Sequence, residues 1–194
     1  MHASTEDHWA AVKCILRYLQ ATTSYGLHVT RGSSMSLNGF TDVDWVGNVD
    51  NKKSTSGYLV YLDNTFFSWK FRKQRTVVRS STEAEYKALA DDTAKILWLC
   101  SLLSELRLPS PPMTTLWCDN LKATFLSVNL VFHARTEHVE VDYHFVCDRV
   151  VKKKIQVWFI SLNDQLTDVL TKPLPSVPFA QFRSKFQVES PFSA

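Results

Sequence analysis

The chain has 194 residues, of which 45% are hydrophobic and 21% are charged, and its formal net charge is +3. This length and composition are typical of one globular α/β domain, alone or with a short appendage. No apolar run reaches the roughly 18 residues that a membrane helix needs, and the first residues lack the basic and apolar regions of a secretory signal. We therefore expect an intracellular protein without a membrane role. The net charge is too small to establish a nucleic-acid partner.

A helix followed by three antiparallel strands is predicted for the first part of the chain. Apolar residues recur at helical spacing over residues 9–19, and Gly26 follows the end of this amphipathic helix. A first strand is expected at residues 36–45. Residues 57–62 and 66–70 then alternate around the turn Asp63-Asn64, which is the pattern of a hairpin.

A long helix and then alternating strands and helices are predicted for the remainder. Over residues 82–106 the apolar period changes to 3.6, and the prolines at positions 109, 111 and 112 end this helix. The pattern then predicts a strand at 114–118, helices at 121–128 and 136–152, a strand at 155–162 and a helix at 165–171. Phe179, Phe182 and Phe186 predict a last amphipathic turn or two docked on the body.

Four acidic residues stand in four separate segments, each beside an apolar run: Asp42, Glu85, Asp119 and Asp168. An ionised carboxylate that faces a protein core is costly unless a cation or hydrogen-bond donors compensate it. The pattern therefore predicts a carboxylate cluster that holds divalent metal. The cysteines at positions 14, 100, 118 and 147 have no CxxC spacing and are interpreted as buried free thiols, not as zinc ligands or disulfides.

Helical phase distinguishes the two glutamates at the start of the long helix. Glu85 lies on the same side as Leu89 and Ile96, whereas Glu83 lies near the opposite side. A capping box of Thr82 with Glu85 is the alternative interpretation. Ser80 with Glu83 forms an equally good box, which would leave Glu85 free.

The aspartates carry weaker signals. Asp42 and Asp44 are two apart on a strand and share a face, so the pattern does not choose between them. Asp119 precedes a helix and has an N-cap as its alternative role, although Asn120 is an equally suitable cap. Asp168 falls opposite its apolar neighbours on a helix, so periodicity does not bury it.

A basic run with an interleaved phenylalanine follows the hairpin and consists of Lys70, Arg72, Lys73, Arg75 and Arg79. Such a run either contacts nucleic-acid phosphates or is a solvated loop. Asn120 and His138 are also expected near nucleic acid, with a structural cap as the alternative for His138. The lysines at 152–154 follow a helix and are assigned to dipole compensation and solubility.

The motifs of the chain resemble those of the ribonuclease H domain of copia-class LTR retrotransposon polyproteins. The matching stretches, in family order over nearly all of the chain, include GFTDVDWVGN, KKSTSGYLVYL, SSTEAEYKALA, LWCDNLKAT and DQLTDVLTKPLP. The segment HWAAVKCILRYLQATTSYGL resembles the link between the reverse transcriptase and this domain. The resemblance divides the chain into a leading helix and linker at 1–34, a ribonuclease H-like domain at 35–174 and a tail with a short amphipathic helix at 175–194.

The resemblance implies an α/β, ribonuclease H-like fold with a five-stranded mixed sheet of order 3-2-1-4-5 and helices on both faces. The family's catalytic, metal-binding acids carry over to Asp42, Glu85, Asp119 and Asp168. Two Mg²⁺ or Mn²⁺ ions are implied, and hard oxygen ligands suit Mg²⁺. One ion would activate water for in-line attack while the other stabilises the leaving oxygen, with the ions roughly 4 Å apart.

The implied function is metal-dependent cleavage of the RNA strand of RNA/DNA hybrids during reverse transcription, which leaves 5′-phosphate ends. The implied partners are the hybrid and the reverse transcriptase portion of the same polyprotein, in a cytoplasmic virus-like particle or in the nucleus. The alternative is a decayed or domesticated module that binds hybrids without cutting them. A transposase or integrase is disfavoured because its glutamate follows both aspartates, whereas the order here is Asp, Glu, Asp, Asp.

Some positions depart from the family pattern. Residues 161–165 contain no histidine before the last aspartate, which predicts a slower enzyme. Lys95, Leu130 and Cys147 replace residues that are commoner in relatives, as expected of drift in a decaying element. The active-site motif of reverse transcriptase is absent from this sequence.

Overall fold

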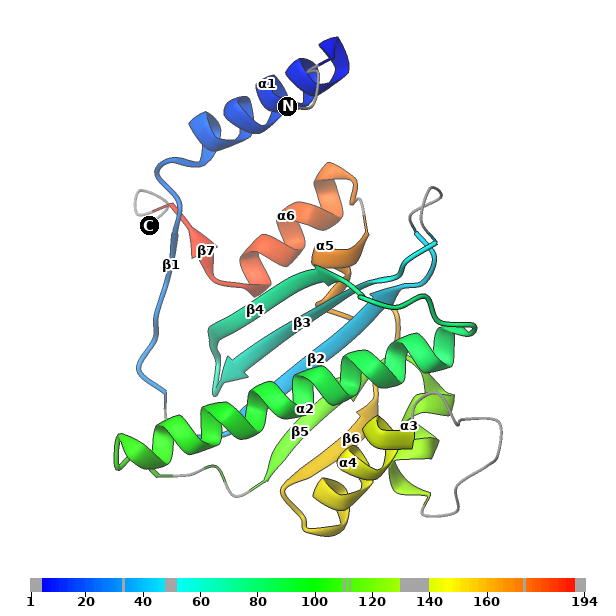
Figure 1. Cartoon of the computed structure of the whole chain (residues 1–194). Coiled ribbons are helices and arrows are strands. Elements are labelled where there is room, and N and C mark those ends of the chain that lie inside the picture. The colour runs from blue at the N-terminus through cyan, green and yellow to red at the C-terminus, as the bar shows by residue number, and fades with distance from the viewer. Residues whose placement is uncertain are drawn as a thin grey trace.

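Five strands pair into one mixed sheet in the order β4-β3-β2-β5-β6 (Figure 1). The computed structural model describes residues 5–32, 34–47, 52–109, 111, 113–129, 140–172 and 174–190. The strands are β2 (Leu37–Asp44), β3 (Thr55–Leu62), β4 (Thr65–Lys73), β5 (Thr114–Cys118) and β6 (Ile155–Phe159). Strand β3 runs antiparallel to both β2 and β4, whereas β5 is parallel to both β2 and β6. The predicted fold class and strand order are confirmed.

One face of the sheet is covered by the long helix α2 (Ser81–Glu105), with α3 (Leu121–Val128) and α4 (Glu140–Val151) beside it (Figure 1). The predicted apolar stripe of α2 is buried in the main core, where Leu89, Ile96 and Leu103 pack against strand residues such as Leu116. The helix approaches β2 closely at Gly39, where an added Cβ would lie 2.7 Å from Asp92 Oδ2 and 2.9 Å from Ile96 Cδ1. A residue without a side chain is required at that crossing.

The opposite face is covered by α5 (Asp168–Thr171) and α6 (Ser176–Lys185) (Figure 1). Leu59 and Tyr61 of β3 form a second core there with Phe186, which follows α6. The rings of Phe66 and Phe186 are stacked with centroids 5.1 Å apart. The predicted docking of the phenylalanine-rich tail is thus confirmed, and both faces of the sheet carry helices.

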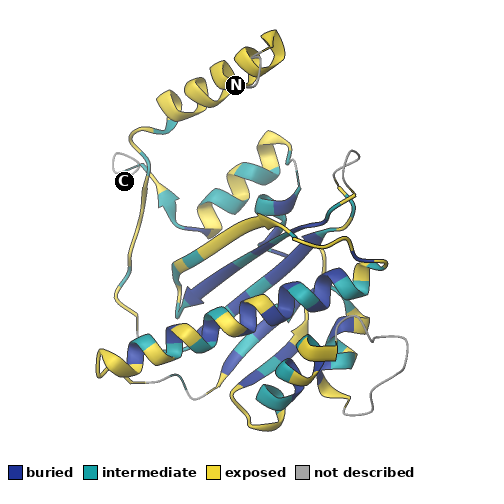
Figure 2. Ribbon diagram, viewed as in Figure 1, coloured by how far each residue is buried: buried dark blue, intermediate teal, exposed yellow. Residues whose placement is uncertain are grey.

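The N-terminal helix α1 (Glu6–Thr22) buries none of its residues (Figure 2). It is longer than predicted because Thr5 and His8 cap its start through a reciprocal pair of hydrogen bonds. The two-residue strand β1 (Gly26–Leu27) then pairs antiparallel with β7 (Val188–Glu189). This ribbon was not predicted, since two residues are too few to show a period of two.

Other differences from the predicted elements concern their ends and exposures. Strand β4 continues three residues past its predicted end, through a basic stretch without apolar alternation, because its backbone pairs with β3 as far as Thr55. Strand β6 ends three residues early, and α5 spans four residues instead of seven. The four cysteines are free, but Cys14 is exposed because α1 does not pack. Among the residues that the structure describes, no helix is long and apolar enough to cross a membrane.

Candidate metal centre and nucleic-acid interface

The four predicted acids come from four elements that meet at one end of the sheet. Asp42 lies on β2, Asp119 directly follows β5, Glu85 lies in α2 and Asp168 begins α5. Strands β2 and β5 are parallel, and Thr41 lies opposite Cys118. Asp42 and Asp119, the residues that follow these two, therefore lie side by side at the same end of the sheet. One carboxylate oxygen each of Asp42, Asp119 and Asp168 lies within 4.8 Å of the other two.

The cluster is largely removed from solvent, and two of its oxygens lack protein partners. Asp42 is 1% exposed and Glu85 is 6% exposed. Within the described residues, Glu85 Oε2 and Asp119 Oδ1 are buried and make no hydrogen bond. Buried carboxylate oxygens are normally satisfied by donors or by a cation, so these two are candidates for metal ligation.

Burial and mutual repulsion change the protonation of the cluster. Burial, followed by the charges of Asp119 and Asp42, raises the pKa of Glu85 to about 9. Burial and then the charge of Asp42 raise the pKa of Asp119 to about 6. Burial also raises the pKa of Asp168, against the opposing effect of Lys172. At neutral pH a carboxyl group with the pKa of Glu85 is mostly protonated, and a bound cation would favour its charged form.

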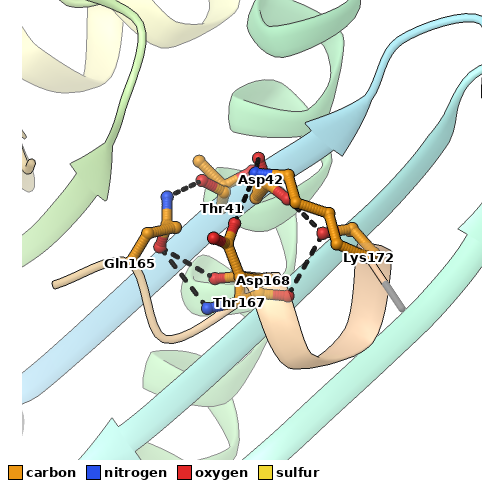
Figure 3. A network of polar contacts seen from close by, with 7 residues as sticks. Thr41, Asp42, Gln165, Thr167, Asp168 and Lys172 are labelled. Atoms are coloured by element: carbon orange, nitrogen blue, oxygen red, sulfur yellow. Dashed lines mark hydrogen bonds and ion pairs between the residues drawn. The ribbon is translucent and has the colours of Figure 1, made fainter. Parts of the chain in front are cut away.

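Lys172 is a member of the site that the sequence analysis missed. Its Nζ lies 2.6 Å from Asp168 Oδ1 and 3.6 Å from Asp42 Oδ1 (Figure 3). Burial alone would lower its pKa, but the neighbouring carboxylates of Asp168 and Asp42 outweigh burial, and the pKa is raised. The spacing of Asp168 and Lys172, four residues apart, is the signal that could have identified the pair.

The segment that carries Asp168 is fixed by contacts with the sheet. Gln165 is fully buried, and its Nε2 donates a hydrogen bond to the carbonyl oxygen of Thr41 at 2.9 Å, while its Oε1 accepts one from Thr167 (Figure 3). Thr171 Oγ1 donates a hydrogen bond to Asp42. A Cβ on Gly57 would lie 3.1 to 3.3 Å from α5 side chains and the preceding Thr167, so the bare glycine lets α5 approach β3. These contacts, and not periodicity, place Asp168 in the site.

The structure also distinguishes the alternatives for the other acids. Asn120 caps α3, because its Oδ1 accepts a hydrogen bond from the backbone N–H of Ala123 at 3.0 Å, so Asp119 is not the cap. Ser80 caps α2 through the N–H of Glu83 at 3.2 Å, which leaves Glu85 free, as its helical phase predicts. Asp42 and not Asp44 joins the other carboxylates.

Cys118 brings a sulfur close to the cluster, contrary to the expectation that no cysteine would do so. Its Sγ lies within 4.8 Å of a ligand atom of both Glu85 and Asp119. Burial, followed by the charge of Glu85, raises the pKa of this thiol. A protonated thiol is a poor metal ligand, so the donors available at neutral pH are carboxylate oxygens, which suit Mg²⁺ or Mn²⁺ better than zinc.

The basic run lies on the strand at the edge of the sheet and beyond it. Lys70, Arg72 and Lys73 belong to β4 and are exposed, as are Arg75 and Arg79. The interpretation as a solvated loop is therefore wrong for the strand residues. Together with Lys87 of α2, all except Arg79 line a depression of about 330 Å³. His138 lies outside the described residues.

Comparison with known proteins identifies relatives along almost the whole chain. No protein-family profile matches it. It is 46% identical over 190 residues to the retrovirus-related Pol polyprotein from transposon RE2 of Arabidopsis thaliana, with 97% of the chain covered. It is 39% identical over 183 residues to the corresponding polyprotein from transposon TNT 1-94 of Nicotiana tabacum, with 94% of the chain covered. The chain spans only 13% of the length of each relative.

Solved structures support the fold. The N-terminal RNase H domain of Rv2228c from Mycobacterium tuberculosis superposes with a TM-score of 0.53 at 13% identity, over 71% of this chain and 91% of that one. LC11-RNase H1, solved in complex with an RNA/DNA hybrid, gives a TM-score of 0.52 at 11% identity, over 70% and 93% of the two chains. The chain is therefore a ribonuclease H-like domain homologous to one segment of retrovirus-related Pol polyproteins.

Proposed function

We propose that this domain is a divalent-metal-dependent endonuclease that cleaves the RNA strand of RNA/DNA hybrids for a retrotransposon Pol polyprotein. The observation that carries the proposal is that four acids from four elements form two adjoining groups, Asp42 with Asp119 and Asp168, and Glu85 with Asp119. Buried oxygens of Glu85 and Asp119 have no protein partner among the described residues. Buried carboxylate oxygens are normally paired, and a metal ion bound among these acids would supply the partner for both.

The residues present fit two Mg²⁺ or Mn²⁺ ions. Asp42, Glu85, Asp119 and Asp168 would hold them, and all four offer hard oxygen ligands. When bound, the ions supply an activated water and stabilise the leaving 3′ oxygen, which gives 5′-phosphate products. The chain's own contribution is positioning, because β2, β5 and α2 are packed in the core and Gln165 anchors the segment before α5.

The basic depression is suited to the phosphates of the substrate. Arg72 of β4 lies opposite Ser56 of β3, which lies opposite Val43 of β2. Val43 is the residue after Asp42, so Arg72 is two strands away from the candidate metal centre. Neighbouring strands lie about 4.8 Å apart, so Arg72 is about 10 Å from the strand of Asp42. Five basic residues and two acidic residues line the depression: Lys70, Arg72, Lys73, Arg75 and Lys87, with Asp91 and Asp142. Such a surface supports sequence-independent contact with a nucleic-acid backbone.

Selectivity for a hybrid would come from shape and from contacts to 2′-hydroxyls in a wide minor groove, not from reading bases. LC11-RNase H1, which shares the fold, has been solved with such a hybrid. We therefore expect cleavage of the RNA strand without a strong sequence preference.

The decisive experiment is an assay of a uniform RNA/DNA hybrid with the full chain in Mg²⁺, in Mn²⁺ and in chelator. Metal-dependent appearance of 5′-phosphate RNA fragments supports the proposal, and double-stranded DNA should remain intact. Hybrid binding without cleavage in either metal would overturn the nuclease assignment in favour of a binding module.

A second experiment tests the basic surface. Replacing Arg72, Lys73 and Arg75 together by alanine should weaken hybrid binding and reduce its salt dependence by about 0.7 to 0.9 in logarithmic slope per lost phosphate contact. The matched control replaces Lys152, Lys153 and Lys154, which follow α4. This variant loses the same number of positive charges as the first. An unchanged slope in the first variant would show that its residues do not contact phosphates.

A further inference from the structure

Lys172 places a positively charged ammonium group between two of the acids that would bind a metal ion, Asp42 and Asp168. It follows α5 directly, and its Nζ contacts Asp168 Oδ1 at 2.6 Å and Asp42 Oδ1 at 3.6 Å. An ammonium group cannot ligate a metal ion, and it would repel one placed between the same two carboxylates. Lys172 and a metal ion are therefore alternative partners for that half of the cluster.

Contacts with Lys172 are confined to one half of the cluster. Asp42 forms an ion pair with Lys172, which directly follows α5 (Figure 3). Asp42 also accepts a hydrogen bond from the hydroxyl group of Thr171, the last residue of α5. Glu85 Oε2 and Asp119 Oδ1 make no hydrogen bond within the described residues. The lysine thus contacts only Asp42 and Asp168, whereas its charge acts on Glu85 and Asp119 from a greater distance.

The position of the side chain allows it to leave. The Lys172 side chain is 37% exposed, whereas that of Asp42 is 2% exposed. A lysine chain with four methylene groups can rotate its ammonium from a buried carboxylate to water without moving the backbone. The backbone N–H of Lys172 donates a hydrogen bond to the carbonyl oxygen of Asp168 at 2.9 Å. Rotation of the side chain leaves this bond intact, so the last turn of α5 is retained.

We infer that Lys172 is a built-in counter-ion of the metal site, which holds Asp42 and Asp168 together until a divalent cation displaces it. This inference rests on the proposed function, because it assumes that the cluster binds metal. Lys172 is a positioning residue that acts through the two aspartates. Its presence stabilises the metal-free fold and weakens metal binding at the same time.

The test uses Lys172→Met, which keeps the length of the side chain and removes its charge, and Lys172→Arg, which keeps the charge. Lys152→Met is the matched control, since Lys152 also contacts an aspartate four residues earlier, with Nζ 2.8 Å from Asp148 Oδ1, but both of these side chains are exposed. In chelator, Lys172→Met should melt about 2–4 °C below wild type. Lys152→Met should melt close to wild type, because an exposed pair contributes little.

Calorimetric titration with Mg²⁺ or Mn²⁺ supplies the second readout. Lys172→Met should bind metal about three- to tenfold more tightly than wild type, a range that allows for screening of a partly exposed lysine. Lys172→Arg should resemble wild type in chelator. Equal melting of Lys172→Met and Lys152→Met in chelator, or weaker metal binding by Lys172→Met, would overturn the inference. Failure of wild type to bind metal or cleave a hybrid would instead count against the proposed function, and the melting comparison in chelator would still decide the role of Lys172 as counter-ion.

Discussion

Replacing the buried carboxyl group of Asp92 tests how the stability of the core depends on pH. Asp92 lies in α2, is fully buried against β2 at Gly39, and neither carboxylate oxygen has a hydrogen-bond partner among the described residues. Burial, with the charge of Asp91 in addition, raises the pKa of Asp92 well above its ordinary value of 3.8. The folded state therefore retains a proton that the unfolded chain has already lost, so the contribution of Asp92 to stability is greatest below about pH 4 and falls as the pH rises.

The size of the effect follows from the linkage between proton binding and folding. Each pH unit between the unfolded and the folded pKa lowers the free energy of unfolding by about 1.4 kcal/mol. From pH 5 to pH 8 the loss has a ceiling of about 4 kcal/mol. Asp92→Ala removes this dependence and leaves a small cavity that costs roughly 1 kcal/mol. Relative to wild type, the variant should therefore gain stability between pH 5 and pH 8, by up to about 4 kcal/mol.

Urea unfolding followed by circular dichroism at pH 5, 6, 7 and 8 measures this difference. The stability of Asp92→Ala relative to wild type should increase with pH, and other titrating groups such as Glu85 cancel in the comparison. Glu105→Ala is the control, because Glu105 is an exposed acid at the far end of the same helix. A difference between Asp92→Ala and wild type that stays constant across the pH range would refute the reasoning, since it would show that Asp92 has no shifted ionisation.

Replacing Glu85 by glutamine should abolish most hybrid cleavage, whereas Glu83→Gln should retain it, because Glu85 faces the cluster and Glu83 accepts a hydrogen bond from the backbone N–H of Arg79. Equal loss in both variants, with unchanged circular dichroism, would contradict the assignment. Gly57→Ala should lower the melting temperature by about 2–5 °C and weaken cleavage, because the added Cβ would lie only 3.1 to 3.3 Å from atoms of α5 and Thr167. Gly26→Ala is the control, since its Cβ meets nothing within 4 Å and should change neither property. Millimolar Mg²⁺ should raise the melting temperature of wild type by binding only the folded cluster. A melting curve unchanged up to tens of millimolar Mg²⁺ and Mn²⁺ would argue against a metal site.

Local patterns predicted the parts of the site that are held by long regular elements. Glu85 is placed by the phase of a 25-residue helix, and Ser80 is the cap that leaves it free. The strand patterns placed Asp42 and Asp119 beside the core, although they did not separate Asp42 from Asp44, which is two residues away on the same face. In these segments every turn or every second residue repeats the same signal, so the direction of one side chain can be predicted from its neighbours.

The remainder of the site depends on contacts that no local pattern shows. A four-residue helix has no usable period, and periodicity suggested that Asp168 is solvated. Its position is set by the bond between Gln165 and Thr41, which are 124 residues apart. The end of β4 likewise depends on pairing with β3, which extends the strand through Arg72 and Lys73. Lys172 was missed for a different reason, since a lysine near a predicted helix is usually assigned to solvent.

The order of the elements along the chain has a consequence for shortened gene products. All five strands of the sheet are complete at Phe159, whereas Asp168, Thr171 and Lys172 lie beyond that residue. A ribosome therefore makes the whole sheet before it makes the last acid and its lysine. A gene copy with a stop codon just after β6 would lose Asp168 together with Phe182 and Phe186, which pack beside Leu59. Truncation at that point would remove one acid of the candidate metal centre and uncover an apolar sheet face in a single event, so the product should aggregate.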